Sequence, residues 1–195
     1  MLFLTRHGET RQALESIVQG QSDTRLTPKG EMDSVVLGDH LGRHQNIQTI
    51  MTSDLSRAVR TAKLIAQRMN PSPRIVEVAA LRELACGVLE GQPSARLRDL
   101  RLSDPRGAED AVPPGGESLA AMRHRVLSWY GGFVAMVSKE TLIITHKGPL
   151  AVILATIAPA LPAAMVKVAL EHSSLVALEL DRSGTAAVVD VIRPG

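Results

Sequence analysis

Residues 1–10 read MLFLTRHGET, where a short apolar run passes at once into a cluster of polar side chains. The apolar run at 2–5 is too short for the core of a signal peptide and has no basic residues before it, so we interpret it as a buried strand. In an open sheet of alternating strands and helices, ligands bind just outside the carboxyl ends of the strands. Arg6 and His7 therefore stand where such a sheet carries its chemistry.

The same alternation of short apolar runs and amphipathic stretches continues outward from this segment. Thr27-Pro28 marks a helix start, with threonine as N-cap and proline at the first helical position. We expect helices over 28–43, 54–69, 117–137 and 149–158, and strands over 2–5, 48–52, 74–78, 141–145, 166–170, 175–180 and 186–192. A turn at 181–184 joins the last two strands. Residues 92–114 have little periodicity and are interpreted as a partly helical excursion over the sheet.

This pattern predicts an α/β fold: a three-layer sandwich with a mostly parallel central sheet and helices on both faces. The length of 195 residues suits one domain, 1–195, and is too short for two of full size. The segment 148–166 carries no charge, but Pro159 and Pro162 would break a membrane-spanning helix there. We therefore expect a short buried helix followed by a loop, and no membrane association.

Composition excludes several classes of partner. Hydrophobic residues make up 45% and charged residues 22%, and the net charge is only +2, whereas a nucleic-acid binder usually carries a stronger basic excess. The single cysteine, Cys86, rules out an intrachain disulfide and a thiolate metal cluster, and it fits a reducing, cytoplasmic compartment. We expect no metal, no cofactor, no nucleic acid and no membrane partner. The expected state is a monomer or homodimer.

Five polar residues follow the predicted strands and converge on one rim of the sheet: Arg6, His7, Arg57, Glu83 and His146. Arginines are planar bidentate donors suited to a phosphate dianion. A neutral imidazole is a competent nucleophile near pH 7, and a second imidazole stabilises charge on the transferring oxygens. A carboxylic acid opposite the nucleophile can protonate the leaving oxygen and then activate water. The set therefore indicates phosphoryl chemistry.

At this point the chain resembles the histidine phosphatase superfamily, also called the phosphoglycerate-mutase-like family, and its phosphatase branch in particular. The resemblance covers nearly the whole chain in matching order and spacing, and rests on these segments: Arg6-His7-Gly8-Glu9-Thr10, Gln19-Gly20, Leu26-Thr27 with Gly30, Thr52-Ser53-Asp54-Leu55-Ser56-Arg57-Ala58, Leu81-Arg82-Glu83-Leu84, Gly116-Glu117-Ser118 and Thr145-His146-Lys147-Gly148. An RHG triplet alone would be weak, but the ordered set is specific.

The resemblance implies a role for each matching residue. His7 resembles the nucleophile that forms a phosphohistidine, and Glu83 resembles the proton donor. Arg6, Arg57 and His146 resemble the groups that clamp the phosphoryl oxygens. The family hydrolyses phosphate esters without metal or organic cofactor.

Two departures from the family pattern affect how substrate is held. Many members carry an asparagine that reaches the phosphate where this chain has Ala13, so that hydrogen bond is absent or supplied from elsewhere. Many members have glycine after the second histidine, where this chain has Lys147. We expect Lys147 to lie beside the pocket and to pair with a second anionic group of the substrate.

The function expected from these residues is a metal-independent phosphomonoesterase, a histidine acid-type phosphatase acting on a small phosphorylated metabolite. One alternative is a phosphoglycerate-type mutase, which must shield its phosphoenzyme from water. Family mutases carry longer insertions between the glutamate and the second histidine than the excursion at 92–114. A second alternative is a non-catalytic phosphate-binding protein, against which the intact His7, Arg57, Glu83 and His146 argue. A dinucleotide-binding oxidoreductase lacks its glycine-rich turn after the first strand.

Overall fold

The computed structural model describes residues 1–135, 140–180 and 186–192. Its elements are β1 (Leu2–Arg6), α1 (Arg11–Leu14), α2 (Pro28–His44), β2 (Thr49–Thr52), α3 (Ser56–Ala66), β3 (Arg74–Glu77), the 3-10 turns η1 (Ala79–Leu81) and η2 (Gly87–Leu89), α4 (Ser94–Ser103), α5 (Leu119–Val134), β4 (Thr141–Thr145), α6 (Lys147–Ile157), α7 (Ala163–Ala169), β5 (Leu175–Leu180) and β6 (Ala186–Ile192). Strands and helices alternate along most of the chain, as the sequence predicts.

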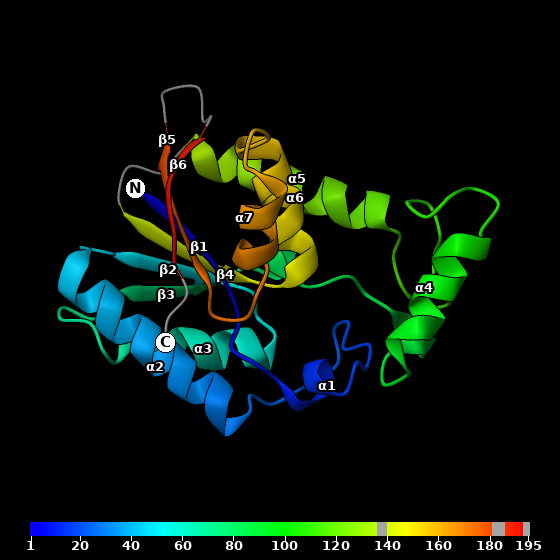
Figure 1. The fold of residues 1–195 in the computed structure, drawn as a ribbon, viewed down its shortest axis with the longest axis horizontal. Coiled ribbons are helices and arrows are strands. Elements are labelled where there is room, and N and C mark those ends of the chain that lie inside the picture. Colours follow the sequence, from blue (N-terminus) through cyan, green and yellow to red (C-terminus); the bar gives the residue numbers. More distant parts are fainter. Residues whose placement is uncertain (136–139, 181–185, 193–195) are drawn as a thin grey trace.

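The six strands form one sheet in the order β3-β2-β4-β1-β5-β6. The pairs β3/β2, β2/β4 and β4/β1 are parallel, whereas β1/β5 and β5/β6 are antiparallel. Helices α2 and α3 cover one face, and α5 and α6 cover the other (Figure 1). The predicted three-layer sandwich with a mostly parallel sheet is confirmed, and the antiparallel pairs are confined to its C-terminal edge.

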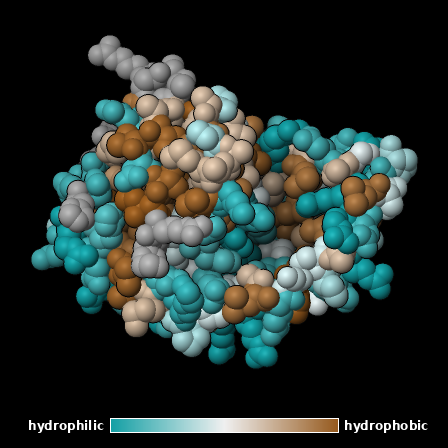
Figure 2. All heavy atoms as spheres, viewed as in Figure 1, coloured by the Kyte–Doolittle hydropathy of each residue, from teal (hydrophilic) through white to brown (hydrophobic). Residues whose placement is uncertain are grey.

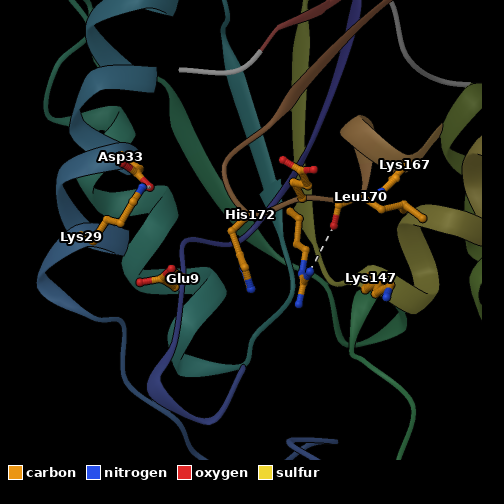
Figure 3. A pocket seen from close by; sticks show the side chains of 9 residues that line it. Glu9, Lys29, Asp33, Lys147, Lys167, Leu170 and His172 are labelled. Atoms are coloured by element: carbon orange, nitrogen blue, oxygen red, sulfur yellow. Dashed lines mark hydrogen bonds and ion pairs between the residues drawn. The ribbon is translucent and has the colours of Figure 1, made fainter. Parts of the chain in front are cut away.

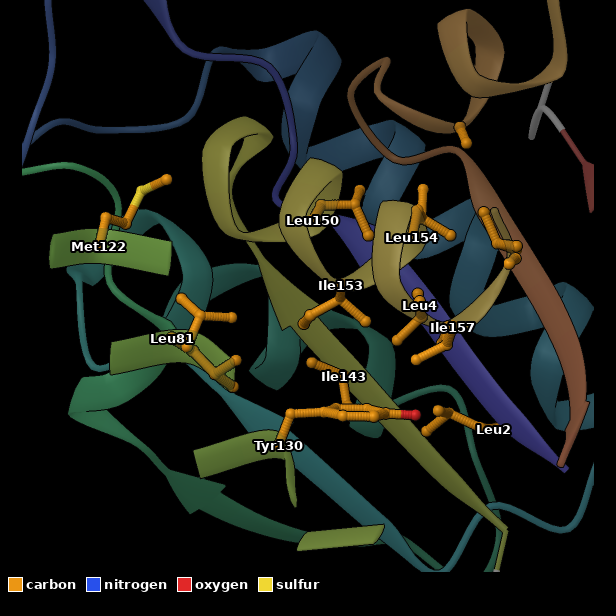
Figure 4. Close-up of a cluster of buried hydrophobic side chains, with 14 of the residues drawn as sticks. Leu2, Leu4, Leu81, Met122, Tyr130, Ile143, Leu150, Ile153, Leu154 and Ile157 are labelled. Atoms are coloured by element: carbon orange, nitrogen blue, oxygen red, sulfur yellow. The ribbon is translucent and has the colours of Figure 1, made fainter. Parts of the chain in front are cut away.

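Strand β1 shows why both faces need a helical layer. Its side chains alternate, so Leu2 and Leu4 join one buried cluster while Phe3 joins the other. On the first face, Ile153 of α6 packs toward Leu4, and Tyr130 of α5 lies next to Leu2 (Figure 4). Because the central strands are apolar on both sides, both faces of the sheet are covered by helices, and the sheet gives the site a rigid base.

Most predicted elements are present with ends within three residues of the predicted ones, and the strands at 141–145, 175–180 and 186–192 have the predicted bounds. Thr27 caps α2, with its Oγ1 accepting a hydrogen bond from the Gly30 backbone N–H at 3.0 Å. The excursion at 92–114 is partly helical, as expected, and contains α4. The predicted turn at 181–184 and the predicted helix end at 136–137 lie outside the described residues.

The strand predicted at 166–170 is wrong, because this segment belongs to helix α7. Val166 and Val168 suggested a strand through their branched side chains. Pro162 instead sets the N-terminal end of a helix, and the alanines at 163, 164 and 169 favour it. The helix buries Ala169 and packs near β6, so tertiary burial outweighs the strand propensity of two valines.

The apolar segment at 148–166 is divided between α6 and α7. In the part of the chain that the structure describes, no helix is both long and apolar enough to cross a membrane.

Gly30 packs closely against the backbone of Glu9, two residues after His7. A Cβ at this position would lie 2.3 Å from the Glu9 carbonyl oxygen and 2.6 Å from its nitrogen. Gly30→Ala is therefore expected to lower the free energy of unfolding by about 1–3 kcal/mol, because backbone must move. Gly132→Ala is the control: it lies in α5 with nothing within 4 Å of a new Cβ, and should raise stability by about 0.5–1 kcal/mol. Urea unfolding measures both, and equal effects would contradict the packing explanation.

Candidate active site

The parallel pair β1/β4 brings the two predicted histidines together. Arg6 is opposite Thr145 in the register, and the His7 backbone N–H donates to the Thr145 carbonyl at 3.0 Å. The side chains that follow, His7 and His146, have ring centroids 5.0 Å apart and are both buried. Residues 139 positions apart thus meet because their strands are neighbours.

A short hydrogen bond fixes the tautomer of His7. Its Nδ1 lies 2.7 Å from the carbonyl oxygen of Gly8, which only accepts, so Nδ1 carries the proton and donates it. Nε2 then bears the lone pair. Burial, and next the charges of His146, Arg57 and Arg6, hold the pKa of His7 well below its usual value of 6.5. The imidazole is therefore neutral and nucleophilic at neutral pH.

Arg57 enters the site from the first turn of α3 and is anchored by the loop at 19–24. Its Nη1 donates to the Ser22 carbonyl at 3.0 Å and to Thr24 Oγ1 at 3.2 Å, and its Nη2 donates to the Gly20 carbonyl at 2.7 Å. Burial lowers the pKa of Arg57 to about 10, which leaves it cationic at neutral pH. Its buried Nε has no partner within the described chain, and so keeps a donor for a ligand.

Arg6 is the second guanidinium of the site. One Nη1 proton is donated to the Leu170 carbonyl at 3.1 Å, which ties Arg6 to the end of α7 (Figure 3). Its buried Nε is also unpartnered in the described part of the structure. Both ring nitrogens of His146 are likewise buried and without a hydrogen-bond partner among the described residues. Buried polar groups cost free energy when unpaired, so these donors fit a site built to bind an anion.

Glu83 follows η1 and projects toward the same site from the opposite side. Its carboxylate accepts from the Leu84 backbone N–H at 2.9 Å and from the Gly148 N–H at 3.3 Å. Arg125 on α5 holds the loop from behind by donating to the carbonyls of Ala80 at 2.8 Å and Arg82 at 3.1 Å. The glutamate is half-buried, which leaves it accessible to water.

One cavity of about 650 Å³ collects most of the predicted residues. Arg6, His7, Arg57, Glu83 and Lys147 all line it. His146 does not line it, and lies buried against the His7 ring. Ala13 is not at this cavity either, in line with a methyl side chain that cannot hydrogen-bond a phosphate.

A second cavity of about 550 Å³ adjoins the first and shares Arg6, Lys147 and Leu170 with it (Figure 3). Its lining is charged and carries both signs, including Glu9, Lys29, Asp33 and Lys167. Lys29 is paired with Asp33 at 2.6 Å. The exposed Lys147 thus stands between the two cavities, beside the site as predicted.

Two residues at the site escaped the sequence prediction. His172, which the sequence left without a role, donates Nδ1–H to the His7 carbonyl at 3.0 Å, and its ring centroid lies 5.1 Å from that of His7. Gln19 lines the main cavity, and its Oε1 accepts from Thr10 and Thr24 hydroxyls at 3.0 Å each. Its oxygen is thereby engaged, which leaves the amide NH₂ as the group of Gln19 that can still donate. The one sequence signal for Gln19 was the Gln19-Gly20 segment of the family resemblance.

Among residues 1–135, 140–180 and 186–192, no three histidine, cysteine or carboxylate side chains are grouped closely enough to hold a metal ion.

Two buried histidines and the half-buried His172 predict how stability changes with pH. The pKa values of His7, His146 and His172 are lowered, chiefly by burial, and that of His172 falls to about 4. Below pH 6.5 the unfolded chain binds more protons than the folded one, so stability falls as pH falls. Each histidine should cost about 1.4 kcal/mol between pH 7.5 and pH 5.5. Urea unfolding at both pH values measures this loss, which should shrink by about that amount in His172→Asn. An unchanged loss would contradict the burial of His172.

The chain is similar in sequence and in structure to several known proteins. A family model described as histidine phosphatase superfamily (branch 1) matches residues 2–191. A Salmonella choleraesuis protein named "Probable phosphoglycerate mutase GpmB" is 35% identical over 161 residues, which cover 80% of this chain and 74% of that protein. The solved structure of Bacillus stearothermophilus YhfR is 29% identical, with a TM-score of 0.76, and covers 96% of this chain and 94% of that one. A mycobacterial glucosyl-3-phosphoglycerate phosphatase, solved with VO3, is 28% identical with a TM-score of 0.76, covering 100% and 98%.

Proposed function

The chain belongs to branch 1 of the histidine phosphatase superfamily, whose members are phosphatases or mutases, and from this we propose that it is a metal-independent phosphomonoesterase acting through a phosphohistidine at His7. We further propose that residues 1–195 form a single domain of this kind. The substrate is a small phosphorylated metabolite.

The observation that carries the proposal is the tautomer of His7. Its Nδ1–H is donated to Gly8, so its Nε2 lone pair is the reactive one, in a site that also holds Arg6, Arg57 and Glu83. A nucleophile, anion donors and a carboxyl group are the parts that phosphoryl transfer through an enzyme intermediate requires.

In the first step, Arg6 and Arg57 bind the phosphoryl oxygens from the cavity wall, and His7 Nε2 attacks phosphorus in line with the ester bond. His146 lies buried beside the His7 ring and is proposed to reach a phosphoryl oxygen through an unpartnered ring nitrogen. The P–N bond forms as the P–O bond breaks. The bonding electrons pass to the ester oxygen, which takes a proton from the Glu83 carboxyl and leaves as the alcohol. The guanidinium groups stabilise the charge that spreads over the phosphoryl oxygens.

In the second step, the Glu83 carboxylate takes a proton from water while the water oxygen attacks phosphorus. The P–N bond breaks, its electrons return to His7 Nε2, and inorganic phosphate is released. Glu83 is again a carboxylic acid, so both residues are ready for another turnover.

Hydrolysis is favoured over a mutase reaction by the light cover on the site. A mutase must keep water away from its phosphoenzyme. In this chain the segment 92–114 covers the site only with helix α4, which has no buried residues. Glu83 remains half-buried and accessible to water. The relative named as a phosphoglycerate mutase keeps the mutase reaction as the second candidate.

Turnover of p-nitrophenyl phosphate with and without EDTA tests the proposal. We expect equal rates in both, because the proposed steps use only side chains of this chain. On 3-phosphoglycerate, release of inorganic phosphate should exceed transfer to the 2-position. Faster transfer than release would establish the mutase, and absence of turnover on a wide panel of esters would favour a non-catalytic phosphate-binding protein.

Lys147 is proposed as a substrate-binding residue at the margin of the cavity. It is exposed and borders both cavities, so its ammonium is placed to pair with an anionic group of the substrate other than the transferred phosphoryl.

A further inference from the structure

One face of helix α4 borders the active-site cavity. Ser94, Leu97, Arg98, Arg101 and Leu102 all line it, at the spacing of residues that share one side of a helix. Figure 1 shows α4 standing apart from the sheet and its covering helices. Figure 2 shows a hollow between the body and this lobe, with apolar side chains at its margin. The helix therefore forms a wall of the cavity opposite the catalytic residues.

The fold makes little use of this face. Helix α4 has no buried residues, and Leu102 is 77% exposed. Among the described residues, the hydrogen-bond and ion-pair partner of the Arg98 side chain is its neighbour Asp99, at 3.4 Å between two exposed side chains, which contributes little. Arg101 has no hydrogen-bond or ion-pair partner in the described residues. Leu97 packs against the core cluster, whereas Leu102 and the two arginines face the cavity with little structural role.

Arg101 is close enough to the inner wall to act on it electrostatically. Burial, followed by Glu83 and Glu90, raises the pKa of the Cys86 thiol to about 12, and Arg101 acts in the opposite direction. Arg101 and Cys86 both line the cavity, and Arg101 is only partly exposed to solvent.

The cavity is much larger than a phosphoryl group, and its remaining wall is largely apolar. Side chains that line it away from the catalytic groups include Ile17, Val18, Leu84, Leu119 and Met122. Pockets of a few hundred Å³ with such walls bind organic groups, and a few charged residues fix their orientation. The charges here are strongly unbalanced, with five cations against Glu83: Arg6, Arg57, Arg98, Arg101 and Lys147.

We propose that the alcohol part of the substrate has an apolar body, which packs between α4 and the core, and an acidic group at its far end, which pairs with Arg98 and Arg101. Arg6 and Arg57 are taken by the phosphoryl group, and Lys147 lies at the margin shared with the second cavity, where it can pair only with an anionic group near that margin. The α4 arginines are the cations left for an acidic group at the far end of the apolar body. This inference rests on the proposed phosphatase function and names the class of its substrates: phosphate monoesters of apolar hydroxy acids.

The test uses two matched series of esters, butyl, hexyl and octyl phosphate and the phosphate monoesters of the corresponding ω-hydroxy acids. In the wild-type protein, kcat/KM should be about tenfold higher for the acidic ester of the best length than for its neutral partner. The preference should fall in high salt, because exposed charges are screened. In the double variant R98Q/R101Q the ratio should fall to about one.

Arg96→Gln is the control, because it removes one positive charge from the same helix, as each of the two test substitutions does, at an exposed position that lines neither cavity. It should keep the wild-type ratio. Leu102→Gln tests the apolar part and should lower kcat/KM for octyl phosphate about threefold while leaving methyl phosphate unaffected.

Three results would overturn the inference while leaving the phosphatase intact: equal rates for acidic and neutral esters, a ratio that survives in R98Q/R101Q, or a ratio abolished by Lys147→Gly alone. The last would place the acidic group at Lys147 instead. If the wild-type protein hydrolyses no ester in either series or in a wider panel, the proposed function fails and this inference fails with it.

Discussion

Replacing His7 with asparagine is expected to reduce hydrolysis of phosphate monoesters by a factor of about 10⁴ or more. An asparagine side chain can still donate to the Gly8 carbonyl, but it offers no nitrogen lone pair to phosphorus. The covalent route is then closed, and the remaining donors of the site only bind the ester. The loss should appear in kcat more than in KM, because Arg6 and Arg57 remain.

Rapid quenching with ³²P-labelled substrate provides a second readout. The wild-type protein should carry label that is acid-labile and alkali-stable, as a phosphoramidate is, and His7→Asn should carry none. His124→Asn is the matched control, because His124 is exposed on α5 and lines neither cavity. Labelling that persists in a folded His7→Asn protein would show that another residue is the nucleophile.

Replacing Glu83 with glutamine should lower kcat/KM by about 10²–10⁴ for alkyl phosphates, whose leaving alkoxide needs a proton. The defect should be much smaller for p-nitrophenyl phosphate, because p-nitrophenolate leaves without protonation. Glutamine keeps one oxygen that can accept from the Leu84 backbone N–H at 2.9 Å, and it gives up only the longer contact to the Gly148 N–H at 3.3 Å, so the loop should hold its position. The expected result is a steeper dependence of rate on leaving-group pKa.

This dependence is measured with a series of aryl and alkyl phosphates. Glu77→Gln is the control, because Glu77 is an exposed carboxylate at the end of β3, outside both cavities. The same loss for all leaving groups would contradict a role as proton donor, and would assign Glu83 to binding instead.

The sequence predicted the catalytic half of this molecule because that half is local. Polar residues that directly follow an apolar strand must lie at its carboxyl end, and parallel strands place such ends at one edge. His7 and His146 meet for this reason, across the paired ends of β1 and β4. The roles of these residues, however, stay predictions until the experiments above are done.

Contacts between segments that share no sequence pattern became visible only in the folded chain. His172 lies 165 residues from the His7 carbonyl that it binds, and nothing in its surrounding sequence indicates that partner. The segment of α7 looked like a strand until its burial near β6 was known. Likewise, the sequence of α4 is that of an ordinary solvated helix. Only the folded structure shows that its arginines Arg98 and Arg101 line the cavity. Strand ends and helix caps can be predicted from neighbouring residues in the sequence. The role of a helix face depends on the residues that pack against it, which are distant in the sequence.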